Sequence, residues 1–454
     1  MKYLMRGKIQ KTIAVTMTAF LLLSDTETVT ATKTDKNYVE INSEPNFSAN
    51  KLLSKIKKKS EKKSPVQKQS DKAVIIVEID GETEDIEGPV DTQDAKSRHS
   101  SVFNNINESI ANNDELNTEE SHVTYLKDYY NIFDGIAVEA YESDVSAIIE
   151  TEGVKSAYLE KIYSITADEK DDGTEIDDLI SLSGIDESDY TGKGQAIAII
   201  DSSLFTGHEV FNTEPEDARY SEDDMEEIRD ELGEGCEGSY ISAKIPFAYD
   251  YADHDNDVNP DNCSSVSARG THIAGLAVGN ADDYRGIAPD AQLIFCKVSP
   301  DKKNTVAESD LFSAMDDCLK IGVDEVNLSF SSVTPGFSTT ESSALWKDIL
   351  EKYQEKGIIV NAAAGKNNSD SKENPGSLPD NGNIGRPAAF EKTMAVAGVR
   401  LEGMSRSENS FDSAATVGPT PELKLKPDIT APSGIVSASA ESSEHTSASS
   451  ISMP

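Results

Sequence analysis

The sequence predicts an α/β protein in which a parallel sheet, covered by helices on both faces, follows a smaller α+β domain. Two observations predict this fold class. Beyond about residue 175, apolar β-branched runs alternate with helix-permissive segments, which is typical of a parallel sheet with helical crossovers. Between residues 73 and 166 the order is strand, helix, strand, strand, helix, strand, which is the split βαβ arrangement. The length of 454 residues leaves room for both domains.

Residues 1–31 are predicted to be a signal peptide. A positive leader precedes the apolar run Thr12–Leu23, and the small residues Val29 and Ala31 offer a cleavage site. The run is shorter than the roughly 20 residues that a membrane span requires, and no other segment is long or apolar enough to span a membrane. We therefore expect a secreted or cell-surface protein with no membrane span after cleavage. An uncleaved anchor is the alternative.

Residues 32–72 are predicted to be a lysine-rich disordered linker. Lys51–Lys72 holds nine lysines against Glu61 and Asp71, and like charges at this density resist collapse. The segment is either a solvated tether or a contact for cell-wall polymers.

The charge balance disfavours two classes of partner. The chain has 82 Asp and Glu against 42 Lys and Arg, so its net charge of −40 repels nucleic acids and anionic membranes. Four cysteines are too few for a disulfide scaffold at this length. Cys236 and Cys263 lie in polar sequence and could pair, whereas Cys296 ends an apolar run and is expected to be a buried thiol.

The region over residues 73–166 is expected to form a ferredoxin-like α+β domain. Its predicted elements are a strand over Ala73–Ile79, a helix over Ser97–Ala111, strands over His122–Tyr130 and Phe133–Ala140, a short helix over Glu142–Glu152 and a strand over Val154–Ile162. The larger domain spans residues 175–454. Its predicted strands include Gln195–Ile200, Gln292–Val298, Asp324–Phe330, Ile358–Ala363 and Thr393–Val399.

Two acidic segments lie in the larger domain. Glu214–Glu234 is expected to be a solvated insertion. Asp253, Asp255 and Asp257 are spaced like the start of a calcium loop, but Val258 and Ser264 stand where that loop needs glycine and a bidentate glutamate. Calcium binding is therefore possible but unsupported, and no other metal site is predicted.

Polar motifs follow the predicted strands, where ligands of open α/β sheets gather. They include I-I-D-S-S ending the first strand, S-A-R-G-T-H-I-A-G, V-N-L-S-F-S, N-A-A-A-G-K-N, K-P-D-I-T-A-P and S-I-S-M-P. From about Asp178 to Pro454, this series resembles the subtilisin-like serine peptidases (subtilases), most closely the cell-envelope type. Upstream, Y-Y-N-I-F-D-G-I-A-V-E-A and G-V-K-S-A-Y-L-E resemble the inhibitory propeptide of that family. The resemblance implies a peptide or protein ligand and an intramolecular propeptide partner.

The resemblance implies acyl transfer by Asp, His and Ser, but this chain departs from the pattern. Asp201 occupies the aspartate position and Ser452 that of the nucleophile, whereas Arg269 stands at the catalytic histidine and Lys366 at the oxyanion asparagine. The implied substrate-binding residues are Ser329, Phe330 and Ser331 on one strand and Ala363, Ala364 and Gly365 on another. Serine also replaces the usual glycine at Ser203 and Ser331.

A guanidinium has no acceptor lone pair and stays protonated, so Arg269 is unable to act as a general base and is expected to pair with Asp201. The sequence therefore predicts an inactive or strongly impaired peptidase homologue that binds a peptide or a partner. One alternative is an active endopeptidase with non-standard residues, in which either His272 is the base or Ser452 and Lys366 form a dyad. Another alternative is a cell-surface scaffold. Because Ser452 lies two residues before the end, the larger domain is expected to be incomplete.

Overall fold

The computed structural model describes a defined subset of the chain. These residues are 4–6, 28–34, 38–44, 71–80, 92–113, 123–165, 176–183, 190–230, 232, 238–260, 269–301, 303–332, 341–365, 384–402, 405–411, 416, 418–420, 422–440 and 445–448. Contacts divide the chain into one unit over residues 1–69 and another over residues 70–454, and each is described by itself. Within the described residues, no helix has the length and apolar character that crossing a membrane requires.

The first unit contains a small antiparallel sheet in the order β1 (Leu4–Arg6), β3 (Tyr38–Glu44), β2 (Thr28–Thr34). This differs from the prediction that disorder begins at residue 32. The segments T-V-T-A-T-K-T and Y-V-E-I-N-S-E contain many β-branched residues and a tyrosine, a composition that favours strands although both segments are polar. The apolar run Thr12–Leu23 and most of the lysine-rich segment lie outside the described residues.

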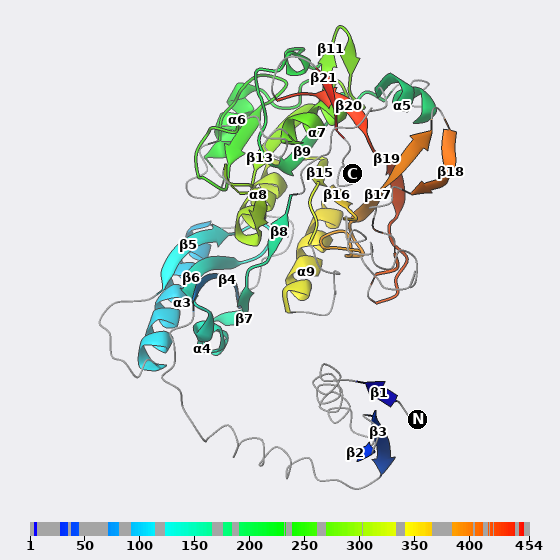
Figure 1. The fold of residues 1–454 in the computed structure, drawn as a ribbon. Coiled ribbons are helices and arrows are strands. Elements are labelled where there is room, and N and C mark those ends of the chain that lie inside the picture. Colours follow the sequence, from blue (N-terminus) through cyan, green and yellow to red (C-terminus); the bar gives the residue numbers. More distant parts are fainter. Residues whose placement is uncertain are drawn as a thin grey trace. The chain divides into compact units, whose positions relative to one another are not determined.

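Residues 71–165 contain the predicted ferredoxin-like arrangement, called here the N-terminal α+β domain. Its elements are β4 (Lys72–Ile79), α3 (Thr92–Asn113), β5 (Thr124–Tyr129), β6 (Gly135–Tyr141), the 3₁₀ turn η1 (Glu142–Asp144), α4 (Val145–Ile149) and β7 (Val154–Leu159). The strands pair antiparallel in the order β5-β6-β4-β7 (Figure 1). Helix α3 places Val102, Ile106 and Ile110 on one face, and these residues join the core formed by β4 and β6.

The larger domain is built on a sheet of seven parallel strands plus one antiparallel edge strand. The strands are β10 (Phe247–Asp250), β13 (Gln292–Lys297), β9 (Ala196–Asp201), β15 (Glu325–Leu328), β16 (Ile359–Ala363), β17 (Met394–Glu402), β18 (Ser405–Phe411) and β19 (Ile429–Pro432). They are ordered β10-β13-β9-β15-β16-β17, with β18 antiparallel and β19 parallel to β17. This confirms the predicted parallel α/β sheet.

Different helices pack on the two faces of the sheet, and alternate side chains of each strand contact one set or the other. Ala198 and Ile200 of β9 share a core with α8 (Glu308–Ile321) and α9 (Glu341–Glu355). Ile199 of β9 lies instead in the core that includes α7 (Arg269–Val278) and α5 (Ile176–Ser183). Because both faces are covered, the strands are nearly continuous apolar runs.

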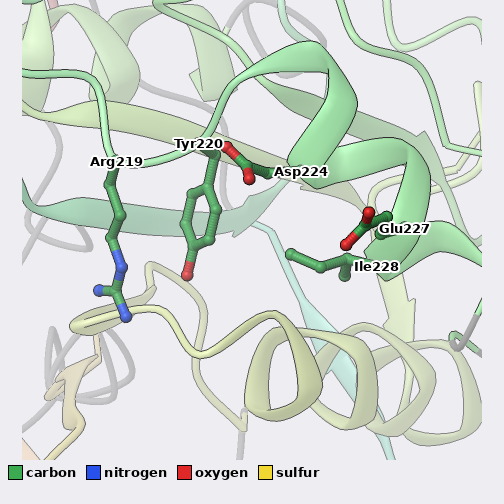
Figure 2. Close-up of a pocket in the computed structure, with 5 residues that line it drawn as sticks. All are labelled: Arg219, Tyr220, Asp224, Glu227 and Ile228. Carbon is green, nitrogen blue, oxygen red and sulfur yellow. The ribbon is translucent and has the colours of Figure 1, made fainter.

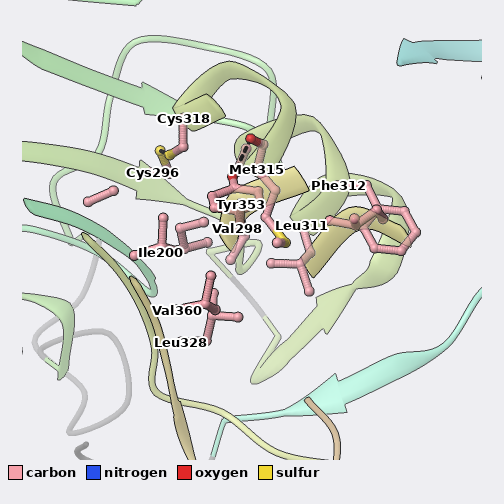
Figure 3. Close-up of a cluster of buried hydrophobic side chains, with 14 of the residues drawn as sticks. Ile200, Cys296, Val298, Leu311, Phe312, Met315, Cys318, Leu328, Tyr353 and Val360 are labelled. Atoms are coloured by element: carbon pink, nitrogen blue, oxygen red, sulfur yellow. Dashed lines mark hydrogen bonds between the residues drawn. The ribbon is translucent and has the colours of Figure 1, made fainter. Parts of the chain in front are cut away.

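The core beneath α8 contains a pair of reduced cysteines (Figure 3). Cys296 of β13 is fully buried, as predicted, and its Sγ lies 3.7 Å from that of Cys318 on α8. Burial raises the pKa of Cys296 well above its ordinary value, so the thiol stays protonated. The proposed partners Cys236 and Cys263 lie outside the described residues.

Shorter elements complete the larger domain. They are η3 (Glu209–Phe211), α6 (Glu222–Arg229), β11 (Asn280–Ala281), β12 (Tyr284–Arg285), β14 (Thr305–Ala307), β20 (Ile435–Ala438) and β21 (His445–Ala448), whereas β8 (Ile162–Ser164) is the last strand of the N-terminal α+β domain. Within the acidic insertion, Ser221 and Asp224 form a capping box that starts α6, where acidic residues also complement the helix dipole.

Candidate active-site cleft

Asp201 is the last residue of β9 and lies at the carboxyl edge of the sheet. Its side chain is fully buried, and its Oδ1 accepts a hydrogen bond of 2.7 Å from the backbone N–H of Ser202. The loop that follows is hydrogen-bonded to the start of α7. The N–H of Gly270 donates to Ser202 Oγ at 3.1 Å, and a Cβ at Gly270 would lie only 2.5 Å from the Ser203 carbonyl oxygen. Glycine at this position therefore permits the close approach.

Arg269 is the first residue of α7, and the structure brings it to Asp201 as predicted. Its Nη1 donates to Asp201 Oδ2 at 2.7 Å, and neither side chain has any exposed surface. Its Nη2 donates to the Ser329 carbonyl oxygen just beyond β15. The guanidinium thus bridges two strand ends with donors, and it offers no atom that could take a proton.

His272, the alternative base, lies one turn further along α7. The residue is 4% exposed and its Nε2 lies 3.0 Å from the Ile435 carbonyl oxygen of β20. A carbonyl accepts only, so Nε2 carries the proton in this contact. This histidine links α7 to β20.

The implied substrate-binding residues lie on neighbouring strand ends. Ser329 and Phe330 follow β15 and are buried, and Ser331 forms an antiparallel β-bridge with Ser164. Ala363 ends the adjacent strand β16 and Ala364 follows it, and Gly365 then turns the chain with φ +105°, a conformation that favours glycine. Lys366 and Ser452, the implied oxyanion and nucleophile positions, lie outside the described residues.

The end of the N-terminal α+β domain runs as an extended segment between β14 and Ser331. The sequence predicts one strand over Val154–Ile162, but β7 ends at Leu159 and a separate strand, β8, begins at Ile162. Strand β8 pairs antiparallel with β14, the N–H of Ile165 donates to the Asn304 carbonyl at 3.0 Å, and Ser164 bridges to Ser331. We call Lys161–Ile165 the tail, and the site between β14 and Ser331 that it fills the cleft.

The tail inserts Tyr163 into an aromatic pocket that also contains a carboxylate. Tyr163 has no exposed surface, and its hydroxyl donates to Glu308 Oε1 at 2.9 Å. Trp346 Nε1 donates to the same oxygen at 2.7 Å, and the N–H of Lys161 donates to Glu308 Oε2 at 3.2 Å. The Phe330 ring centroid lies 5.6 Å from that of Tyr163. Burial raises the pKa of Glu308, and the donated hydrogen bonds offset part of that effect.

Sequence reasoning did not find this pocket, although a signal was present. The tail, K-I-Y-S-I, is rich in β-branched and aromatic residues, which favour a strand. Only the fold brings it to Glu308, about 145 positions further along the chain.

A second contact joins the N-terminal α+β domain to α8. The carboxylate of Asp316 accepts backbone N–H bonds from Tyr130, Asn131 and Ile132, the last at 2.8 Å. Lys127 also forms an ion pair with Asp310. Burial raises the pKa of Asp316, while these hydrogen bonds favour its charged form.

Two of the three aspartates with calcium-loop spacing, Asp255 and Asp257, are used in local turns. Asp255 and Asp257 accept backbone N–H bonds from residues two positions ahead. Among the described residues, the carboxylates that converge are instead those of Asp250, Asp253 and Asp301. The ammonium group of Lys297 lies among them and pairs with Asp250 and Asp301. Because a lysine supplies the positive charge, we assign no cation site to this cluster.

A groove of about 340 Å³ lies on another part of the larger domain and is lined by Arg219, Tyr220, Asp224, Glu227 and Ile228 (Figure 2). Its Arg219 pairs with Asp324 at 2.9 Å, at the amino end of β15, whereas Asp201 lies at the carboxyl edge. The hydroxyl of Tyr220 donates to the Ile321 carbonyl at 2.6 Å. The groove is therefore separate from the cleft.

Comparison with known proteins identifies relatives of the larger domain. The sequence model of the Subtilase family matches residues 192–453. The chain is similar to a PI-type proteinase of Lactococcus lactis subsp. cremoris, with 27% identity over 284 residues, or 59% of this chain and 14% of the relative. It is also similar to a C5a peptidase of Streptococcus pyogenes serotype M3, with 26% identity over 250 residues, or 52% of this chain and 20% of the relative.

The chain thus spans a fifth or less of the length of these curated relatives. Among solved structures, it is similar to a cold-adapted subtilisin-like serine proteinase, with 20% identity, a TM-score of 0.38, and coverage of 59% of this chain and 72% of that chain.

Proposed function

Because the chain belongs to the subtilase family, we propose that it is an exported peptidase homologue with little or no peptidase activity. In this proposal, it acts by binding an extended peptide or a segment of a partner protein in the cleft. The N-terminal α+β domain is a propeptide-like domain that stays covalently attached and covers the cleft through its tail.

The observation that carries this proposal is the buried ion pair between Arg269 and Asp201. In the acyl-transfer mechanism, the aspartate orients an imidazole that takes the proton of the serine. Here the aspartate binds a guanidinium at 2.7 Å, and that guanidinium has no lone pair for a proton. In subtilisin itself, loss of the catalytic histidine lowers kcat by roughly a millionfold.

The sequence at the other two positions supports the same conclusion. Lys366 stands where an asparagine amide would help to hold the oxyanion, and loss of one such donor costs about a hundred- to a thousandfold in kcat. Ser450 and Ile451 precede Ser452 in place of the usual glycine and threonine.

The tail supports the proposed role of the N-terminal α+β domain. It adds a strand to β14 and reaches Ser331, as a bound peptide would do by β-augmentation. If cleavage of the propeptide requires an active triad, the connection beyond Ile165 stays intact.

A fluorophosphonate probe tests the absence of activity. We expect no covalent labelling of the purified chain, with Ser452→Ala as the matched negative control and an active subtilisin as the positive control. Labelling that the Ser452→Ala variant abolishes, together with hydrolysis of casein, would identify an active endopeptidase with non-standard residues.

N-terminal sequencing tests the attached domain. Protein made in a protease-free host should keep residues 73–166 in the same chain as the larger domain. An N-terminus near Ala167 would contradict this part of the proposal.

A further inference from the structure

The pocket around Tyr163 has a composition that a purely apolar side chain does not satisfy. Its walls are aromatic, with Phe330 and Trp346 packed around the ring. At its end lies the carboxylate of Glu308, which is fully buried. A buried carboxylate requires hydrogen-bond donors, and the tyrosine hydroxyl supplies one of them.

We propose that Glu308 makes this pocket selective for tyrosine, so that the cleft binds extended peptides carrying tyrosine followed two residues later by an aliphatic residue. Glu308 is then the residue that determines specificity. This inference rests on the proposed function, because it assigns a class of ligand to the same cleft.

The backbone of the ligand is recognised independently of its sequence. The tail pairs with β14 over Ile162–Ser164, and the backbone N–H of Glu308 donates to the Lys161 carbonyl at 2.9 Å. An extended chain of any sequence can form these bonds, because they involve main-chain atoms only.

Side chains supply the specificity through the two-residue period of a strand. Tyr163 and Ile165 are 0% and 3% exposed and point into the protein, whereas Ile162, the first residue of β8, is 51% exposed. The ligand motif is therefore tyrosine, any residue, then an aliphatic residue.

A phenol suits the pocket better than other side chains. Phenylalanine would fill the aromatic space but would leave Glu308 with one donor fewer. A lysine ammonium would reach the carboxylate but would leave the space beside Phe330 and Trp346 without a ring. Sites built to bond a hydroxyl reject analogues that lack it more strongly than apolar pockets reject a missing methylene.

The tail itself serves as the test ligand in the full-length chain. Amide hydrogen exchange at Ile165, whose N–H donates to Asn304, reports how often the tail leaves the cleft. We expect Tyr163→Phe to accelerate this exchange by about 10- to 100-fold, as loss of a hydrogen bond to a charged group implies. Tyr190→Phe is the matched control, because Tyr190 is 86% exposed, and it should leave the exchange unchanged.

Two further variants test whether Glu308 is responsible for the preference for tyrosine. In the Glu308→Met background, adding Tyr163→Phe should change the exchange rate at Ile165 by no more than about threefold. The Tyr163→Ala variant retains Glu308 and provides the test if Glu308→Met fails to fold. In this variant, added p-cresol should restore slow exchange at Ile165 and toluene should not.

The selectivity would be refuted if the Tyr163→Phe variant protected the tail as well as the unaltered chain does, or if toluene restored protection as well as p-cresol. Neither measurement depends on catalysis. Failure of the selectivity therefore leaves the fluorophosphonate result intact, and labelling of Ser452 would leave the tyrosine preference as a substrate preference.

Discussion

Removal of one partner of the Arg269–Asp201 pair should destabilise the larger domain far more than removal of both. Arg269→Met keeps the length of the side chain but leaves the Asp201 carboxylate, which has no exposed surface, without its guanidinium at 2.7 Å. Breaking a buried ion pair in this way costs about 3–5 kcal/mol in the free energy of unfolding. Replacing both partners with apolar residues, as in Arg269→Met/Asp201→Leu, is often neutral or stabilising by about 1–4 kcal/mol.

Urea unfolding measures this difference, and the chain contains a suitable reporter. Trp346 is the only tryptophan in the sequence and is fully buried beneath the sheet, so its fluorescence follows the larger domain. The double variant should recover at least about 3 kcal/mol relative to Arg269→Met. Our account of the site is refuted if Arg269→Met costs less than about 1 kcal/mol, or if the double variant is less stable than the single one.

Three further predictions concern pH, catalysis and domain docking. Burial alone would lower the pKa of His99, but its hydrogen bonds with Asp128 and Asp134 outweigh burial and raise it. The stabilisation that protonated His99 provides is therefore fully present below the pKa of about 6.5 in the unfolded chain, and it is lost as the pH rises through the raised pKa of the folded protein. Hydrogen exchange of the α3 amides should become faster over that pH window. If His99→Gln left the pH dependence of this exchange unchanged, His99 would not be the group responsible. Arg269→His together with Lys366→Asn should restore cleavage near Ala167, seen by N-terminal sequencing, whereas Arg269→His alone should be roughly a hundred- to a thousandfold slower. Equal rates would show that Lys366 is not at the oxyanion position. Asp316→Ala should leave the backbone N–H groups of Tyr130, Asn131 and Ile132 without their carboxylate and speed proteolysis of the N-terminal α+β domain at least about tenfold, relative to the exposed control Asp282→Ala. Equal rates in the two variants would exclude Asp316 as a docking residue.

The elements that sequence predicts well are those with a strong local signal. Strand β9 is a continuous apolar run that ends in Asp201, and Gly270 and Thr271 follow Arg269 at the start of a helix. These patterns, with the resemblance to a known family, were sufficient to predict the buried pair. The two sheets were predicted for the same reason, since period and order of elements are local properties.

The elements that sequence misses depend on contacts between distant segments. Tyr163 meets Glu308 only because β8 separates from β7 and pairs with β14. The ammonium group of Lys297 lies among aspartates because β10 and β13 are in register at Asp250 and Lys297. Neither pairing leaves a periodic signal in the sequence, so neither the tyrosine pocket nor the lysine–aspartate cluster was predicted.

The short link between β7 and β8 has a consequence for any partner of the cleft. Only Glu160 and Lys161 separate the two strands, and β7 belongs to a domain that Asp316 holds against α8. The tail is therefore presented to the cleft as an intramolecular competitor, at an effective concentration on the order of millimolar. A free peptide of equal intrinsic affinity would need a similar concentration to fill half of the clefts. A physiological partner must accordingly contact additional surface, or first break the contacts between α8 and the N-terminal α+β domain.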